Sequence, residues 1–147
     1  MKRFLRRTIC SVLVLCMMTS MLSAYATAAQ PAKPRSSAYL DSYMAGTYID
    51  SDGTVTVSVS VDAVVNATQI GARDIYLYES TDGIHFTCVK HYNYLNYPYM
   101  MGSGWYYYHD AVTYNGTYGR YYFANVYVYA ADSTGSDSRL YSTATAH

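Results

Sequence analysis

The stretch that decides the fold is Asp74-Ile-Tyr-Leu-Tyr-Glu-Ser-Thr-Asp-Gly-Ile-His-Phe-Thr-Cys-Val89. Two runs rich in β-branched and aromatic residues flank Asp82-Gly83, where glycine can adopt a positive φ and the aspartate side chain can bond the turn backbone. This pattern predicts a β-hairpin. On its return strand, Val89 falls out of phase with Phe86 and Cys88, so we expect a bulge near the turn.

The segments around the hairpin also have the periodicity of strands. Valine occupies every second position from Val55 to Val61, with Thr and Ser between, which predicts a strand with one buried and one solvated face. Residues 121–131 place Tyr122 with alternating Ala and Val residues on one face, and Asn125 with the other aromatic residues on the opposite face, which predicts a central strand. Weaker patterns predict strands near 43–49, 105–113 and 138–144, and turns or loops at 50–53, 66–71, 92–104, 115–119 and 132–136.

About seven short strands, with no helical periodicity in the segments that follow residue 28, predict an all-β fold, an antiparallel two-layer sandwich. A barrel is the alternative. Gly119 followed by Tyr121-Tyr122 at a strand entry resembles the tyrosine corner of immunoglobulin-like and fibronectin-type sandwiches. In that motif the tyrosine hydroxyl bonds to upstream backbone.

The amino-terminal segment has the composition of a signal peptide. Four basic residues precede a mostly apolar run over 8–22, and small residues at Ala24 and Ala26, or at Ala26 and Ala28, suit a signal peptidase. We expect a helical signal peptide at 1–28, a flexible lead at 29–38 and the sandwich domain at 39–147. The apolar run is shorter than the ~20 residues that span a bilayer, so secretion to the extracellular space is favoured over an uncleaved anchor.

Removal of this segment changes the charge and the cysteine count. Four of the ten basic residues leave with it, which leaves six against ten acidic residues, a formal charge of −4. The six are scattered, which argues against nucleic acid as a partner. Cys10 and Cys16 also leave, so no internal disulfide can form, and we expect the remaining Cys88 to be a small buried hydrophobe.

The motifs that could carry chemistry are weak. His85-x-x-Cys88-x-x-His91 has donor residues at regular spacing, but on a regular strand residue 88 points away from 85 and 91, so no metal site is expected. Gly102-Ser103-Gly104 lacks the pattern of a nucleophile elbow. Glu79 is the sole glutamate, so a pair of catalytic carboxylates is not indicated. We therefore predict no catalytic residue, no cofactor and no enzyme activity; a hydrolase would have to depend on Glu79 or His109.

Tyrosine is the unusual feature of the composition. Of the twenty tyrosines, thirteen lie between Tyr92 and Tyr129, and alternation along strands cannot bury all of them. Tyrosine and tryptophan combine a large rigid surface with a hydrogen-bonding tip, which suits contact with a sugar ring or a protein. We expect a binding surface formed by Tyr97, Tyr99, Trp105, Tyr106, Tyr107 and Tyr108. The alternative is that cross-strand aromatic pairs only stabilise the sheet.

Several segments together resemble a family of small secreted proteins of Gram-positive anaerobes that is known only as a domain of unknown function. They are Tyr39-Leu40-Asp41-Ser42-Tyr43, Ile70-Gly71-Ala72, Ile75 to Gly83, Tyr114 to Thr117, Tyr121 to Ala124 and Ser136 to Arg139. The resemblance implies an exported, β-rich single domain and no particular chemistry. The function expected is that of a secreted, non-enzymatic binding protein whose partner is an extracellular protein or glycan, with no membrane contact in the mature form. The alternative is a bacteriocin-like antagonist or a signalling protein.

Overall fold

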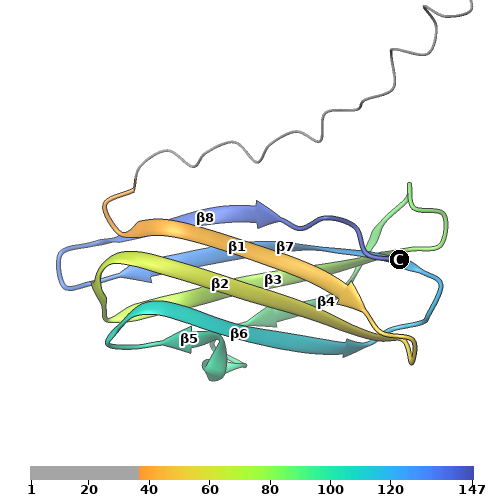
Figure 1. The fold of residues 1–147 in the computed structure, drawn as a ribbon, viewed down its shortest axis with the longest axis horizontal. Coiled ribbons are helices and arrows are strands. Elements are labelled where there is room, and N and C mark those ends of the chain that lie inside the picture. The colour runs from red at the N-terminus through yellow and green to blue at the C-terminus, as the bar shows by residue number, and fades with distance from the viewer. Residues whose placement is uncertain (1–36) are drawn as a thin grey trace, which may run out of the picture. The chain divides into compact units, whose positions relative to one another are not determined.

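Two antiparallel sheets pack face to face in the computed structural model, which describes residues 37–147 (Figure 1). One sheet has the order β1-β2-β6 and the other β4-β3-β7-β8, with β5 paired to one end of β3. The all-β sandwich predicted from the sequence is thus confirmed, while the expected signal peptide at 1–28 lies outside the described residues. The elements are β1 (Leu40–Ile49), β2 (Thr54–Ala67), β3 (Gln69–Ser80), β4 (Thr87–Asn93), the 3-10 turn η1 (Pro98–Met100), β5 (Met101–Gly102), β6 (Trp105–Asn115), β7 (Tyr121–Ala131) and β8 (Ser136–Ser142).

The core lies between the sheets and is built by the alternation seen in the sequence. The four alternating valines of β2, from Val55 to Val61, are at most 2% exposed, and they face Ile75 and Leu77 of β3 and the even-numbered residues of β7. Each such side chain contributes about 1.5–3 kcal/mol when fully buried. Strand β7 lies between β3 and β8, as expected of a central strand. Within residues 37–147 no helix is long and apolar enough to cross a bilayer.

The predicted hairpin is formed by β3 and β4, and its loop is held by Asp82. The Asp82 carboxylate accepts hydrogen bonds from the backbone N–H groups of Ile84 and His85 at 2.9 and 2.8 Å, and Gly83 has φ +72°. The His85 ring and these N–H groups hold the pKa of Asp82 well below its usual range. The expected bulge is present, because the register shifts between Leu77 and Tyr78.

The loop predicted at 66–71 is wrong. Strand β2 runs to Ala67 and β3 begins at Gln69, so the single residue Thr68 carries the chain from one sheet to the other. The Thr68 N–H and hydroxyl both bond to the carbonyl oxygen of Ala131, at 2.8 and 3.1 Å, which fixes this corner. Gly71 lies within β3 and meets β5. Smaller differences are that β1 begins at Leu40, β4 extends to Asn93, β8 spans 136–142 and β5 is an additional two-residue strand.

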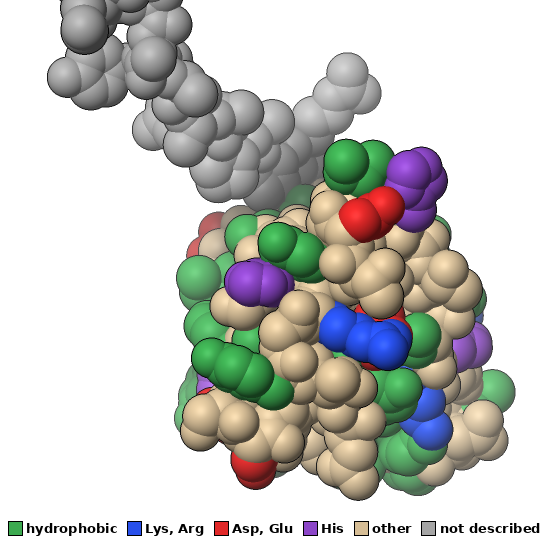
Figure 2. Space-filling view, turned by 90° about the vertical axis from the view of Figure 1, so that its right-hand side faces the viewer, with side chains coloured by type: hydrophobic (Ala, Val, Ile, Leu, Met, Phe, Trp, Pro, Cys, Tyr) green, Lys and Arg blue, Asp and Glu red, His purple; other side chains and the backbone are tan. Residues whose placement is uncertain are grey.

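Tyr122 ties β7 to the loop that precedes it. Its fully buried side chain accepts a hydrogen bond from the backbone N–H of Thr117 at 2.8 Å and donates one to Glu79 at 2.6 Å. Arg120 forms an ion pair with the same carboxylate. This is the contact with upstream backbone that the sequence predicts for the Tyr121-Tyr122 pair. On the end of the molecule seen in Figure 2, the charged side chains are few and dispersed among hydrophobic and uncharged groups.

Candidate aromatic binding site

The connection between β4 and β6 positions the aromatic residues of the candidate site. Residues 94–104 leave the edge of one sheet, form η1 and β5, and enter the other sheet at Trp105. The segment is anchored by the backbone bond from Tyr94 N–H to the Arg73 carbonyl (3.0 Å), by the pairing of β5 with β3 and by Met100, which is 2% exposed. It therefore closes the side of the sandwich below β3 and β6, where η1 and β5 lie in Figure 1.

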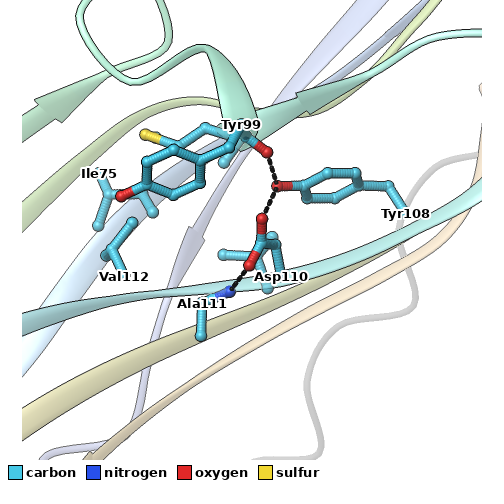
Figure 3. A pocket seen from close by; sticks show the side chains of 9 residues that line it. Ile75, Tyr99, Tyr108, Asp110, Ala111 and Val112 are labelled. Carbon is cyan, nitrogen blue, oxygen red and sulfur yellow. Dashed lines mark hydrogen bonds between the residues drawn. The ribbon is translucent and has the colours of Figure 1, made fainter.

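Tyr108 joins this connection to β6 from the inside. It is 4% exposed, and its hydroxyl oxygen lies 2.8 Å from the Tyr99 carbonyl oxygen and 3.2 Å from an Asp110 carboxylate oxygen, so its single proton is shared between these two acceptors (Figure 3). Burial, reinforced by the Asp110 charge, raises its pKa far above the usual tyrosine value. The prediction that Tyr108 belongs to an exposed binding surface is wrong, because inward alternation on β6 places its ring in the core.

A small cavity lies beside this hydrogen-bonded group. It has about 10 Å³ of space and is lined by Val59, Ile75, Met100, Tyr108 and Asp110, among other residues. That volume is about the least that holds one water molecule, which excludes an organic ligand. The group around Tyr108 is therefore a structural support for the surface outside it.

Trp105, Tyr106 and Tyr107 are all exposed, at 54%, 59% and 68%. Regular alternation would turn Tyr106 inward with Tyr108, but the pairing of β2 with β6 shifts register here. Asp62 lies opposite Tyr107 and Ala67 opposite Trp105, so Tyr106 faces a bulge in β2 and has no partner. None of the three rings stacks on another aromatic ring among the residues that the structure describes.

These three rings border a surface recess of about 450 Å³. Its lining, within residues 37–147, is completed by Gly104 and His109 and contains no Lys, Arg, Asp or Glu. A recess of this size is comparable with small-molecule sites, which are concave, largely aromatic and carry few polar groups. The arrangement suits an uncharged ligand with a flat apolar face.

Tyr97 and Tyr99 lie in a separate cluster. The Tyr97 ring is half-buried, 5.2 Å from the Tyr92 ring and 6.1 Å from the Tyr99 ring, and the Lys90 ammonium lies 6.0 Å from its centre. Tyr99 is 50% exposed but borders the small internal cavity. The structure thus brings together Trp105, Tyr106 and Tyr107, and assigns Tyr97 and Tyr99 to the packing of the connection.

The outer face of the β4-β3-β7-β8 sheet carries aromatic residues that were not included in the predicted site. Tyr78 stacks on Phe123 at 4.8 Å, Phe86 meets Phe123 edge-on at 4.9 Å, and Tyr76 stacks on His91 at 4.2 Å. The alternation of residues along 75–78 and 121–129 predicts that Tyr76, Tyr78 and Phe123 lie on this outer face. Because these rings cover one another, they fit the alternative in which cross-strand pairs stabilise the sheet, at about 0.2–1 kcal/mol each.

The bulge in the hairpin changes the interpretation of Cys88. Because Tyr78 lies opposite Cys88 and Tyr76 opposite His91, Cys88 and His91 share the outer face, whereas regular alternation would separate them. Cys88 is exposed, so the expectation of a buried cysteine is wrong. His91 instead contacts Asp74 at 2.7 Å, and no cluster of three potential metal ligands occurs between Ser37 and His147.

Comparisons with protein-family models, with curated proteins and with solved structures find no match to this chain. The function must therefore be inferred from the residues and their geometry. Within the described residues, the recess beside Trp105 is the feature that combines exposed aromatic rings, concavity and uncharged polar groups.

Alkaline pH should destabilise the protein through the buried tyrosines. Burial raises the pKa of Tyr92 from 10.0 to about 12 and also raises that of Tyr108. Since the phenols bind their protons more tightly in the folded state, their stabilising effect is full below pH 10.0 and is lost as the pH rises toward the folded pKa. Each group can lower the free energy of unfolding by at most about 1.4 kcal/mol per pH unit.

Urea unfolding at a series of pH values above neutrality measures this effect. In Tyr108→Phe the decline should be shallower than in the wild type, because one of the phenols whose pKa is raised in the folded state is absent. An identical decline in the two proteins would show that the Tyr108 hydroxyl does not titrate with the fold.

Proposed function

We propose that this protein is a secreted, non-enzymatic binding protein whose recess beside Trp105, Tyr106 and Tyr107 holds a neutral carbohydrate. The observation that carries the proposal is the exposure of three consecutive aromatic rings, each more than half exposed, around one recess. Exposed apolar groups gathered in one place are typical of interaction sites. The signal-peptide pattern at 1–28 supports secretion.

The chemistry of the lining favours a saccharide over a charged ligand. A pyranose ring presents an apolar C–H face and a rim of hydroxyl groups, and an aromatic ring can cover that face while hydroxyl and imidazole groups bond the rim. Trp105 and the tyrosine rings provide the aromatic faces, and His109 and the phenol hydroxyls provide the polar groups. With no ionic side chain among the described lining residues, an anionic or cationic ligand would gain no charge complementarity.

We also propose that the sandwich is of the immunoglobulin/fibronectin-like class. The division of the strands into β1-β2-β6 and β4-β3-β7-β8 supports this class, because the β2–β3 and β6–β7 connections cross from one sheet to the other as in such sandwiches. The bond between the Tyr122 hydroxyl and the Thr117 backbone, five residues upstream, supports it further. In such folds binding surfaces lie in loops and strand ends at one end of the sandwich.

Depletion from solution by cellulose, chitin, xylan and starch, with pectate as an anionic comparison, tests the binding function. We expect the wild type to bind at least one neutral polysaccharide, and Trp105→Ala/Tyr107→Ala to lose at least about tenfold in affinity, as expected when anchoring aromatic residues are truncated. Tyr118→Ala is the matched control, because Tyr118 is 67% exposed but lies in the loop between β6 and β7.

The control should bind like the wild type, and all three proteins should show a cooperative urea transition. Binding to pectate alone, or equal binding by the double variant, would overturn the proposal.

A further inference from the structure

A second recess adjoins the first across the chain segment Gly102-Ser103-Gly104. It measures about 420 Å³ and is bordered by Thr68 and Gln69 at the β2–β3 corner and by Tyr94, Leu95 and Ser103 of the connection. Gly102 and Ser103 line this second recess, while Gly104 and Trp105 line the first. The two recesses are therefore neighbours that share one short segment as their common border.

The Trp105 ring is held at this border. A Cβ atom on Gly102 would lie 2.7 Å from the Cε3 atom of Trp105, so the ring packs directly on the glycine backbone. The Gly104 N–H bonds to the Ala67 carbonyl at 2.8 Å, and Trp105 lies opposite Ala67. The border is thus anchored to the end of β2, and the indole that lines the first recess packs against a glycine that lines the second.

The second recess continues the chemistry of the first. Leu95 is 72% exposed, Gln69 and Ser103 are exposed, and no Lys, Arg, Asp or Glu lines it among the described residues. Amide and hydroxyl groups beside an exposed apolar side chain again suit a neutral molecule with apolar faces and hydroxyl edges. A ligand that fills both recesses must therefore be extended, with apolar faces and hydroxyl edges repeated along its length.

We infer that the two recesses are successive subsites for an extended, uncharged polysaccharide chain, with the segment Gly102-Ser103-Gly104 as their common border. This inference rests on the proposed carbohydrate-binding function and deepens it. It predicts that affinity depends on the length of the chain, because a short saccharide fills one recess while a longer one reaches Gln69 and Leu95. The two subsites then act as linked sites on one ligand.

Isothermal titration with cello- and chito-oligosaccharides, from the disaccharide to the hexasaccharide, tests the inference on the full mature protein. We expect the affinity to rise by at least about tenfold over the series. In Gln69→Ala/Leu95→Ala the rise should disappear while disaccharide affinity stays unchanged. In Trp105→Ala, affinity should fall at every length. Gln69 and Leu95 are exposed, so the urea midpoint of Gln69→Ala/Leu95→Ala should match the wild type.

Three results would overturn the inference in distinguishable ways. Equal affinity at all lengths would remove the second subsite and leave the carbohydrate function in place. A rise with length that survives in Gln69→Ala/Leu95→Ala would place the additional contacts elsewhere. Absence of binding to every saccharide would overturn both the inference and the proposed function.

Discussion

Gly71→Ala is expected to lower the free energy of unfolding by about 3 kcal/mol or more, a large part of the roughly 5–15 kcal/mol that stabilises an ordinary domain. Gly71 has φ +148°, a conformation that an alanine rarely adopts, and a Cβ atom there would lie 2.2 Å from the carbonyl oxygen of Met100. That oxygen belongs to the backbone of η1, so relief of the clash requires movement of the whole connection. The substitution should therefore also disturb the recess that begins at Gly104.

Gly119→Ala separates the two causes of this effect. Gly119 has φ +80°, but no atom lies within 4 Å of the position of a Cβ, so only the backbone conformation is strained. We expect a loss of about 1–2 kcal/mol, measured by the urea midpoint. Equal losses in Gly71→Ala and Gly119→Ala would mean that the close approach of η1 to β3 does not contribute to stability.

Tyr122→Phe is expected to cost about 2–3 kcal/mol although the ring is retained. The hydroxyl bonds a carboxylate, and its removal leaves the Thr117 N–H and one oxygen of the partly buried Glu79 without that partner. Tyr121→Phe is the matched control on the same strand. The Tyr121 hydroxyl makes no hydrogen bond to any of residues 37–147, so its removal should change stability by less than about 0.5 kcal/mol.

Thermal and urea unfolding of the two variants decide this point. A Tyr122→Phe protein as stable as Tyr121→Phe would show that water replaces the phenol hydroxyl without loss. The Tyr122 contact would then be a by-product of packing and would not hold the entry of β7 in place.

The faces of the strands could be predicted because burial follows alternation. Alternation with a period of two was enough to assign the buried faces of β2, at Val55 to Val61, and of β7, at its even-numbered residues. Gly119 and Tyr122 marked the start of β7. The loop at 66–71 was predicted wrongly because Asn, Thr and Gly are typical of loops. The structure uses Gly71 for a close backbone approach and turns the chain at one residue, Thr68.

Side-chain exposure near bulges could not be predicted, because a bulge reverses the facing of residues on one side of it. The register shift beside Tyr78 turns Cys88 outward, and the shift between Asp62 and Ala67 exposes Tyr106 next to Tyr107. The composition showed where the aromatic residues are concentrated. The pairing of β6 with β2 determines that Trp105, Tyr106 and Tyr107 face solvent while Tyr108 does not. The recesses depend on the path of residues 94–104, which no periodicity describes.

The emission of Trp105 tests the carbohydrate-binding recess most directly, because this is the sole tryptophan of the chain and it lines the first recess. The indole is 54% exposed, so its emission in the free protein should be that of a solvated ring. On titration with the polysaccharide bound best in depletion, we predict a saturable shift to shorter wavelength, which Gln69→Ala/Leu95→Ala should weaken for long chains. Unchanged emission at saturating ligand would contradict a binding site beside Trp105.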